Sequence, residues 1–338
     1  MVAGSTCDVM EYRHVGKMGQ VAPAIGLGCL PFTDAYGAAH WDDMIPTIRL
    51  AIDMGIGLIL VADSYGGGRA ERLIGQAVAG RHHETLIATQ GGTVLSGDGQ
   101  IIGIDGSPAH LRRACDASLR RLGVDQLDLY FLAQVDPRVR LDESVGAIAE
   151  LVHAGKVRYI GLPAVPRTVL RQAHAEHPIT AVLGEYSLWQ RDAERELLPA
   201  ARELAVGFLA CGPLGRGFLT GRIISADGLG PGDSRRDDPR FRGENVRRNR
   251  ELLHTAEQIA ARRDIGIGRL ALAWLLAQGD DIVPVPGTHR RAHVEMNATA
   301  VGVRLDSAQC RELAEAFPPG AVAGADEWWH RQTQGSVP

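Results

Sequence analysis

The chain has 338 residues, of which 45% are hydrophobic and 22% are charged, and its formal net charge is −4. These are ordinary values for a globular protein, and a slightly acidic chain offers no basic surface for a nucleic acid. The sequence has no apolar run of about 18 residues and no apolar leader, which predicts a cytoplasmic protein whose partner is a small molecule, not a membrane. The five cysteines lack a metal-binding spacing, so we expect reduced thiols and no metal.

Strand-like apolar runs alternate with helical patterns along the chain. Glycines 16 and 19 predict a β-hairpin over residues 12–23. We expect strands at residues 24–29, 58–62, 85–89, 127–132, 159–162, 179–183, 206–211 and 282–285, and helices at residues 44–54, 70–79, 108–122, 141–154, 166–175, 194–204 and 268–278. This alternation predicts an α/β fold, a (β/α)8 TIM barrel with an N-terminal β-hairpin. An open, doubly wound sheet is the alternative, but residues 26–31 do not form the GxGxxG motif that it needs.

The whole chain, residues 1–338, is expected to form a single domain. Its hairpin spans about residues 10–23. A segment at about residues 227–249 is rich in Gly, Pro, Asp and Arg and lacks an apolar period, so we expect a long, lid-like loop over one face of the barrel. The C-terminal tail, at about residues 318–338, contains Trp328 and Trp329, which either pack on the barrel or form the wall of a pocket.

Several motifs resemble those of the aldo-keto reductases. They are ADSYG at 62–66, IDGSP at 104–108, SLRRLG at 118–123, DLY at 128–130, GKVRYIG at 155–161, EYSLW at 185–189, PLGRGFLTG at 213–221, LALAWL at 270–275 and PVPGT at 284–288. The resemblance runs in order from about residue 11 to residue 313. It implies a barrel enzyme that reduces a carbonyl with a nicotinamide cofactor. In this family a tyrosine donates the proton, a lysine–aspartate pair lowers the pKa of that tyrosine, and a histidine orients the substrate.

The resemblance implies that Tyr65 is the proton-donating tyrosine, but the residues expected around it are changed. The aspartate position is Leu60, the lysine position is Gln90 and the histidine position is Ala133. Losing both members of the charged pair avoids a buried, unpaired lysine, which would cost several kcal/mol. Without that lysine we expect the pKa of Tyr65 to stay near the ordinary value of about 10.

The candidate catalytic residues are Tyr65, Gln90, Gln134, Asp136 and Asp34. Gln90 either fills the space of the lysine or bonds to a substrate carbonyl. Asp136 follows the fourth strand and either pairs with Arg138 or serves the site. Asp34 lies in the first βα loop and is either solvated or brings a carboxylate to the barrel mouth.

The nicotinamide contacts of the family are also changed, to Pro163, Ala164, Leu183 and Cys211. A nucleotide, if one binds, would contact residues that match the family at the phosphate end: Leu214, Gly215, Arg216, Gly217, Thr288, Arg290 and Asn297. The arginine and glutamate of the adenosine end are replaced by His293 and Met296. We therefore expect no cofactor, with NADP(H) as the alternative. The expected substrate pocket contains Trp189, Cys211, Trp328 and Trp329.

These changes lead to an expectation of cofactor-independent, redox-neutral acid/base chemistry on a small metabolite, such as dehydration, cyclisation or isomerisation. One alternative is an NADP(H)-dependent aldo-keto reductase with a degenerate site. Another is a non-catalytic, ligand-binding protein. Binding of NADPH is the observation that separates these functions.

Overall fold

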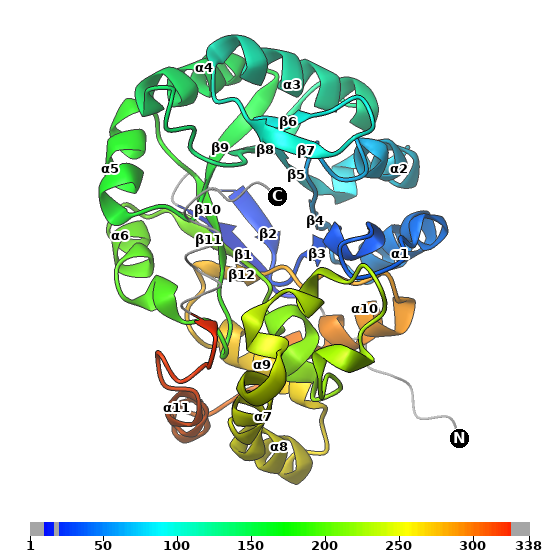
Figure 1. Ribbon diagram of the computed structural model, residues 1–338. Coiled ribbons are helices and arrows are strands. Elements are labelled where there is room, and N and C mark those ends of the chain that lie inside the picture. The colour runs from blue at the N-terminus through cyan, green and yellow to red at the C-terminus, as the bar shows by residue number, and fades with distance from the viewer. Residues whose placement is uncertain (1–9, 17–19, 326–338) are drawn as a thin grey trace.

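An N-terminal hairpin packs against one end of the barrel. The computed structural model describes residues 10–16 and 20–325 (Figure 1). Strands β1 (Tyr12–Val15) and β2 (Gln20–Pro23) pair in antiparallel register, which confirms the predicted hairpin. Val15 and Ala22 from the two strands pack with the apolar side chains that fill the barrel.

The barrel is a sheet of eight parallel strands. In chain order they are β3 (Leu27–Gly28), β4 (Leu58–Leu60), β5 (Leu86–Gly91), β8 (Leu127–Leu132), β9 (Val157–Pro163), β10 (Ala181–Glu185), β11 (Gly207–Cys211) and β12 (Ile282–Pro284), each paired with the next. The first and last strands meet, since Gly26 N donates to Pro284 O at 2.9 Å and Gly28 N donates to Pro286 O at 3.1 Å. The sheet therefore closes on itself, and the predicted (β/α)8 barrel is confirmed.

Helices follow the strands and cover the outside of the sheet (Figure 1). They are α1 (Trp41–Asp53), α2 (Arg69–Val78), α3 (Pro108–Leu122), α4 (Leu141–His153), α5 (Arg167–Glu176), α6 (Leu197–Glu203), α9 (Ile267–Leu276) and α10 (Arg291–Ala298). Helix α3 shows how the sequence sets their limits: Ser107 caps its first turn by accepting from His110 N, and Gly123 ends it with a left-handed backbone. Its buried side chains recur at the helical period and face the sheet.

Helix α10, a helix at Ser307–Ala316 and two additions to the barrel were not predicted. A second hairpin, β6 (Thr93–Leu95) and β7 (Ile101–Ile104), stands between β5 and α3. The loop expected at about residues 227–249 is partly wrong, because helix α7 (Gly243–Glu251) begins within it and α8 (Leu253–Arg262) follows. Helix α7 buries only Val246 and Asn249, so its sequence has almost no apolar period to reveal it.

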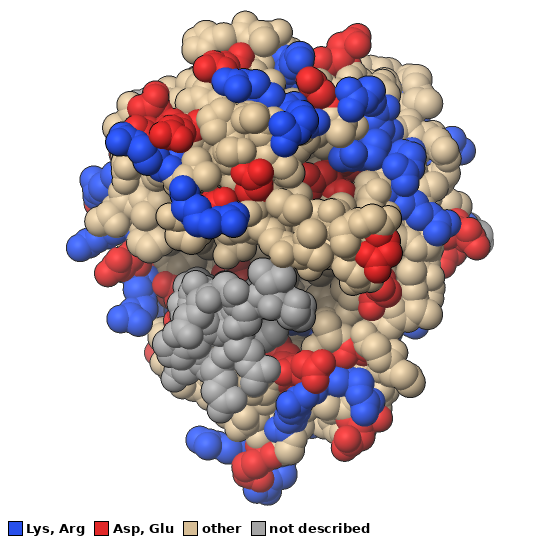
Figure 2. Space-filling model, turned by 45° about the horizontal axis from the view of Figure 1, so that its top comes forward, with Lys and Arg blue, Asp and Glu red and all other residues tan. Residues whose placement is uncertain are grey.

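The remaining described residues form an outer layer on the barrel. Helix α11 (Ser307–Ala316) packs against α8, and the chain is described to Ala325, so Trp328 and Trp329 lie outside the described residues. On the face shown in Figure 2, acidic and basic side chains are interspersed over most of the surface. Over residues 10–16 and 20–325, no helix is long and apolar enough to cross a membrane.

Candidate active site

The upper end of the barrel interior is a ring of uncharged side chains. Alternate residues of a strand point to the same face. Leu60 on β4, Ala88 on β5 and Phe131 on β8 are buried inside the barrel, so the next alternate positions on β5 and β8 also face inward. The ring at the carboxyl ends of the strands consists of Leu60, Gln90, Ala133, Pro163, Leu183 and Cys211. A single amide, from Gln90, is its strongest hydrogen-bonding group.

Tyr65 lies on the turn between β4 and α2, at the same end of the barrel as this ring. Its backbone holds the turn together, since Tyr65 N donates to Ala62 O at 3.1 Å and Tyr65 O accepts from Ala70 N at 3.3 Å. Burial raises the pKa of Tyr65 well above its ordinary value, and the nearby Gln90 side chain lowers that pKa by a smaller amount. The pKa of Tyr65 therefore lies above the expected value near 10, and Tyr65 is a neutral proton donor, as expected.

Gln90 is the ring residue whose side chain acts on the pKa of Tyr65. Its Nε2 also lies 3.5 Å from Val61 O at the end of β4, and Asp63 N donates to Gln90 O at 3.0 Å. The next residue back, Thr89, faces the opposite side of β5, where its hydroxyl donates to the buried carboxylate of Glu71 at 2.7 Å. This alternation fixes the Gln90 side chain on the inner face.

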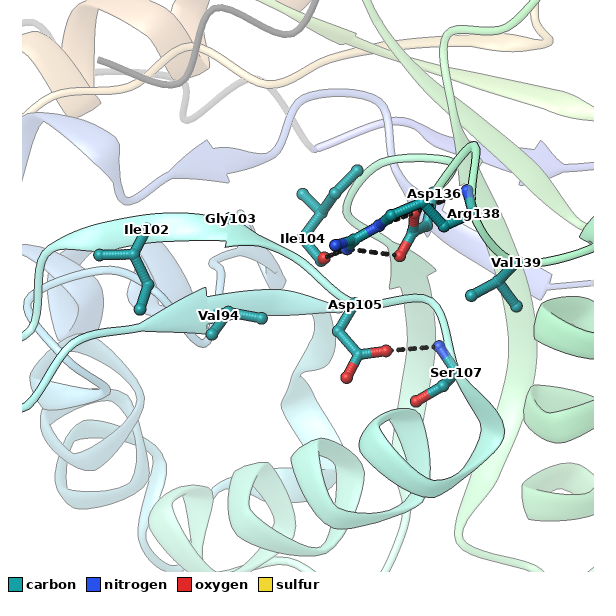
Figure 3. Close-up of a pocket in the computed structure, with 9 residues that line it drawn as sticks. All are labelled: Val94, Ile102, Gly103, Ile104, Asp105, Ser107, Asp136, Arg138 and Val139. Carbon is teal, nitrogen blue, oxygen red and sulfur yellow. Dashed lines mark hydrogen bonds and ion pairs between the residues drawn. The ribbon is translucent and has the colours of Figure 1, made fainter.

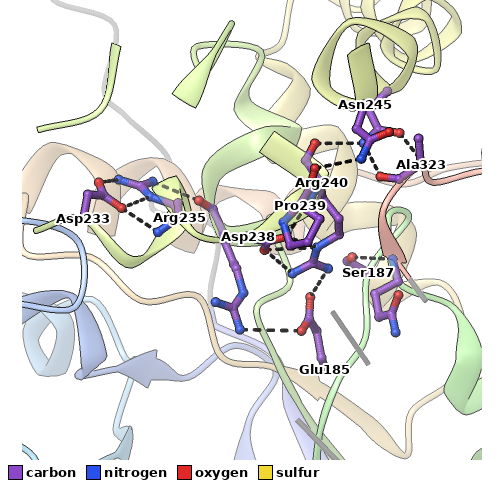
Figure 4. Close-up of polar contacts among 12 residues, drawn as sticks. Glu185, Ser187, Asp233, Arg235, Asp238, Pro239, Arg240, Asn245 and Ala323 are labelled. Atoms are coloured by element: carbon purple, nitrogen blue, oxygen red, sulfur yellow. Dashed lines mark hydrogen bonds and ion pairs between the residues drawn. The ribbon is translucent and has the colours of Figure 1, made fainter. Parts of the chain in front are cut away.

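A strap, residues 233–241, crosses the mouth of the barrel between β11 and α7, and its second half is anchored by a buried ion cluster (Figure 4). The guanidinium of Arg240 donates to Asp238 at 2.7 Å and to Glu185, at the end of β10, at 3.1 Å. Arg240 and Asp238 are both fully buried, and Glu185 is 17% exposed. Glu185 also lies 4.0 Å from Arg216. The cluster therefore joins the strap to the barrel strands by charge.

The first half of the strap binds the loop that follows β3. Tyr36 forms an antiparallel bridge with Asp233, and Ser234 N donates to Ala35 O at 3.0 Å. Arg235 pairs with Asp233 at 2.6 Å and places its guanidinium carbon 4.5 Å from the centre of the Tyr36 ring. Sequence reasoning missed these residues. Their only signal was the density of Asp and Arg in the segment expected to form a lid.

The segment that matches the phosphate end of the family begins at Leu214. Three consecutive residues, Gly215, Arg216 and Gly217, have left-handed backbones, with φ of 56°, 55° and 95°. A side chain on Gly215 would meet the Trp189 ring at 2.7 Å, so glycine is required there. Arg235 clamps the loop by donating to Arg216 O at 3.0 Å.

A second polar group lies at the end of β12. Thr288 Oγ1 accepts from Arg290 N at 3.0 Å and lies 3.3 Å from Nδ1 of His293, whose Nε2 is 3.4 Å from Arg222. Burial, then Arg222 and Arg290, lower the pKa of His293, so its imidazole is neutral near pH 7. Asn297 is buried on α10, one turn further along. The structure thus places Thr288, Arg290 and His293 in contact with one another after β12.

Two expected pocket residues lie in different surroundings. Trp189 is buried below the phosphate-end loop, where it stacks on Phe218 at 4.3 Å and beneath Arg240 at 4.7 Å. Cys211 lies in the ring near Tyr65. Burial and the Glu185 carboxylate raise the pKa of Cys211 to about 12, so its thiol stays protonated and is a poor nucleophile.

The three remaining candidates are exposed or committed to other contacts. Asp136 is buried and accepts from Gly106 N at 3.2 Å and from Arg138 Nε at 3.0 Å, and Arg138 lowers the pKa of Asp136 to about 2. It lines a groove of about 540 Å³ beside the β6–β7 hairpin (Figure 3). Gln134 and Asp34 are exposed. The contacts of Asp136 therefore favour the structural alternative, a pair with Arg138.

Comparisons with known proteins agree on one family. The model described as "Aldo/keto reductase family" matches residues 24–317. A probable aldo-keto reductase 1 from Glycine max is 39% identical over 92% of this chain and 90% of its own length. The glycerol dehydrogenase from Gluconobacter oxydans is 25% identical, with a TM-score of 0.83, over 93% of this chain and 97% of that one. An aldo/keto reductase from Klebsiella pneumoniae, crystallised with NADP and acetate, is 25% identical, with a TM-score of 0.70, over 91% of this chain and 95% of that one.

These likenesses overturn two expectations from the sequence. Redox-neutral chemistry by dehydration, cyclisation or isomerisation is wrong, because the chain matches a probable reductase over nearly its whole length. The expectation of no cofactor is wrong as well, because the same fold in the Klebsiella pneumoniae relative was solved with NADP. Both errors came from treating the loss of nicotinamide contacts as the loss of the nucleotide.

Proposed function

Because this chain belongs to the aldo/keto reductase family, we propose that it is an NADP(H)-dependent reductase of small carbonyl compounds. It is a divergent reductase, with Leu60, Gln90 and Ala133 at the positions of the catalytic aspartate, lysine and histidine. Tyr65 keeps its place as proton donor. One observation carries the proposal: the left-handed loop at residues 215–217 is held in its strained form by Arg235 of the strap, at the mouth of the barrel.

The residues at the phosphate end fit a dinucleotide. A positive φ at a non-glycine residue such as Arg216 persists only where its surroundings enforce it, and such strain is typical of binding sites. The guanidinium groups of Arg216 and Arg235 would neutralise a diphosphate. At the other end, Thr288, Arg290 and His293 would hold the 2′-phosphate that distinguishes NADP(H) from NAD(H). These groups supply the charge that the nicotinamide end lacks.

The nicotinamide supplies a hydride to the carbonyl carbon when the cofactor is bound. The protein must then supply one proton to the carbonyl oxygen, and Tyr65 is the donor above the ring. Its hydroxyl gives up the proton while the Gln90 amide donates a hydrogen bond to the phenolic oxygen and stabilises the negative charge that forms there. Water then returns the proton to Tyr65. A neutral amide stabilises that charge less than an ammonium group, so we expect slower turnover than a complete tetrad gives.

Two measurements test this function. Fluorescence titration of the purified protein should give a saturable NADPH complex with a micromolar dissociation constant. NADPH oxidation with 4-nitrobenzaldehyde should depend on Tyr65. The Tyr65→Phe variant should bind NADPH as the wild type does and lose most of its reductase activity, by about 100-fold or more. Tyr12→Phe, on the exposed strand β1 at the opposite end of the barrel, is the matched control and should behave as the wild type.

Either of two results would contradict the proposal. A protein that shows no saturable binding of NADPH at millimolar concentration does not use this cofactor. A Tyr65→Phe variant that reduces the aldehyde at the wild-type rate would show that the proton comes from another group.

A further inference from the structure

The proposed reductase lacks a second donor for the substrate carbonyl at the usual place. Ala133, at the position of the family's histidine, carries no hydrogen-bonding side chain. The inference below rests on the proposed function, since it concerns the group that takes over this role. Gln134 and Asp34 are exposed, and Asp136 is committed to Arg138 and Gly106. A further polar side chain at the mouth remains to be considered, that of Tyr36.

Tyr36 is fixed by the strap from two directions. Its backbone bridges to Asp233, and its neighbour Ala35 accepts from Ser234 N at 3.0 Å. The guanidinium carbon of Arg235 lies 4.5 Å from the ring centre, a geometry that adds cation–π attraction. Because Arg235 is itself held by Asp233, with atoms 2.6 Å apart, the ring has a stable position on the loop after β3.

Tyr36 shares its surroundings with the candidate catalytic groups. Arg235, whose guanidinium stacks on the Tyr36 ring, donates to Arg216 O at 3.0 Å, and Arg216 lies 4.0 Å from Glu185, the strand partner of Cys211. The loops that carry Tyr36 and Tyr65 follow β3 and β4, which are neighbouring parallel strands. Burial raises the pKa of Tyr36 above its ordinary value, more than Arg216 and Arg235 lower it. The hydroxyl therefore keeps its proton near neutral pH. Two neutral phenols on adjacent loops thus lie at the same end of the barrel as the Gln90 amide.

We propose that Tyr36 is a substrate-binding residue, whose hydroxyl donates a hydrogen bond to the carbonyl oxygen that Tyr65 protonates. The substrate class follows from the ring below. Leu60, Ala133, Pro163 and Leu183 offer no charge and no donor, and Gln90 offers only a neutral amide. An acidic group placed there would therefore lose its hydration without a cation to pair with it. The site takes an uncharged aldehyde or ketone. Tyr36 orients the carbonyl, and the strap sets the position of Tyr36.

The experiment separates the hydroxyl of Tyr36 from its ring. Tyr36→Phe keeps the ring under Arg235 and removes one hydroxyl. We expect kcat/KM for 4-nitrobenzaldehyde to fall about 3- to 10-fold, while NADPH affinity and the unfolding midpoint stay at wild-type values. Tyr36→Leu also removes the cation–π contact, and should weaken NADPH binding because Arg235 clamps the phosphate-end loop. With wild-type protein, 4-carboxybenzaldehyde should be reduced at least 10-fold less efficiently than its uncharged analogue.

Each result of these measurements either supports or overturns the inference. Equal kcat/KM for wild type and Tyr36→Phe would overturn the role of the hydroxyl, and equal use of the two aldehydes would overturn the substrate class. If the wild type oxidises no NADPH, the proposed function fails separately, and binding of 4-nitrobenzaldehyde is then followed by saturation-transfer NMR. Weaker binding to Tyr36→Phe would still support the inference, whereas unchanged binding, or none to either protein, would refute it.

Discussion

Replacing Arg240 by methionine tests whether charge holds the strap on the barrel. Arg240 and Asp238 are 0% exposed, and their side chains meet at 2.7 Å. Arg240→Met would leave the Asp238 carboxylate buried without its cation, a change that costs about 3–5 kcal/mol in proteins. The lost cation–π contact with Trp189 adds about 1 kcal/mol. The Arg240 backbone N–H would still donate to Asp238 at 3.0 Å and offset about 1 kcal/mol. We expect a net loss of about 3–5 kcal/mol in the free energy of unfolding.

Urea unfolding, followed by tryptophan fluorescence, measures this loss against two companion variants. In Arg240→Met with Asp238→Asn, the neutral amide needs no cation and still accepts the backbone N–H, so we expect at least half of the loss to be recovered. Arg242→Met is the matched control two residues away. Its partner Asp237 is 81% exposed, and we expect a change below about 1 kcal/mol.

Two results would refute the reasoning. A loss of less than about 1 kcal/mol for Arg240→Met would mean that water reaches Asp238 and replaces the guanidinium. A double variant no more stable than the single one would mean that packing, not charge, accounts for the loss. In both cases the strap would be held by its apolar residues, Phe241 above all, which lies 5.2 Å from the Trp189 ring.

Three further predictions concern titratable and catalytic positions. Leu60→Asp combined with Gln90→Lys should raise kcat for NADPH-dependent reduction about 10-fold or more, as measured by steady-state kinetics. Gln90→Lys alone should destabilise the fold by several kcal/mol in urea unfolding, because its cation is unpaired. A single variant as stable as the double variant would contradict the argument. Burial and Glu71 raise the pKa of Asp63 to about 7, so the folded chain binds a proton more tightly than the unfolded chain. The free energy of unfolding should therefore fall as the pH rises from about 4 to 7. Asp63→Asn should remove this slope in urea titrations, and an unchanged slope would exclude Asp63 as its source. The pKa of His293 is lowered, and a bound phosphate would raise it, so NADPH affinity should increase as the pH falls while NADH affinity stays flat. His293→Arg should abolish the difference, and parallel profiles for the two cofactors would count against a 2′-phosphate at this place.

Much of the fold could be predicted because strand and helix periods alternate with few interruptions. The strand expected at residues 127–132 is observed as β8 with the same limits, and α3 begins at Pro108 and ends at Leu122 as predicted. The β6–β7 hairpin was not predicted, because its strands are only three and four residues long and its Asp98-Gly99 turn was not used as a signal. Helix α7 was not predicted, because most of its side chains are polar and in solvent and few apolar residues pack against the protein.

The site was predictable where it lies within one motif and not where it depends on distant contacts. Tyr65 and the loop at residues 214–217 belong to short motifs, and each directly follows a strand of the barrel. Tyr36 and Arg235 are nearly 200 positions apart, and only the folded strap brings them together. The function was wrong for a related reason. The sequence shows which charges are lost from the ring, but the arginines that fix the phosphate-end loop come from another part of the chain.

The protonation state of Tyr65 gives the proposed reductase a preferred direction near neutral pH. Reduction needs a protonated tyrosine, and burial keeps Tyr65 protonated by raising its pKa. The alkoxide that forms on hydride transfer is a much stronger base than a phenolate, so the proton moves to it readily. Oxidation of the alcohol needs the phenolate instead, whose population grows about tenfold with each pH unit below that pKa.

We therefore expect kcat/KM for reduction to stay flat between about pH 6 and 9, while kcat/KM for alcohol oxidation rises with a slope near one. Steady-state kinetics in both directions would show this. In the Leu60→Asp, Gln90→Lys variant the oxidation profile should level off at lower pH, because the new cation stabilises the phenolate. A flat oxidation profile in the present chain would mean that a base other than Tyr65 accepts the proton.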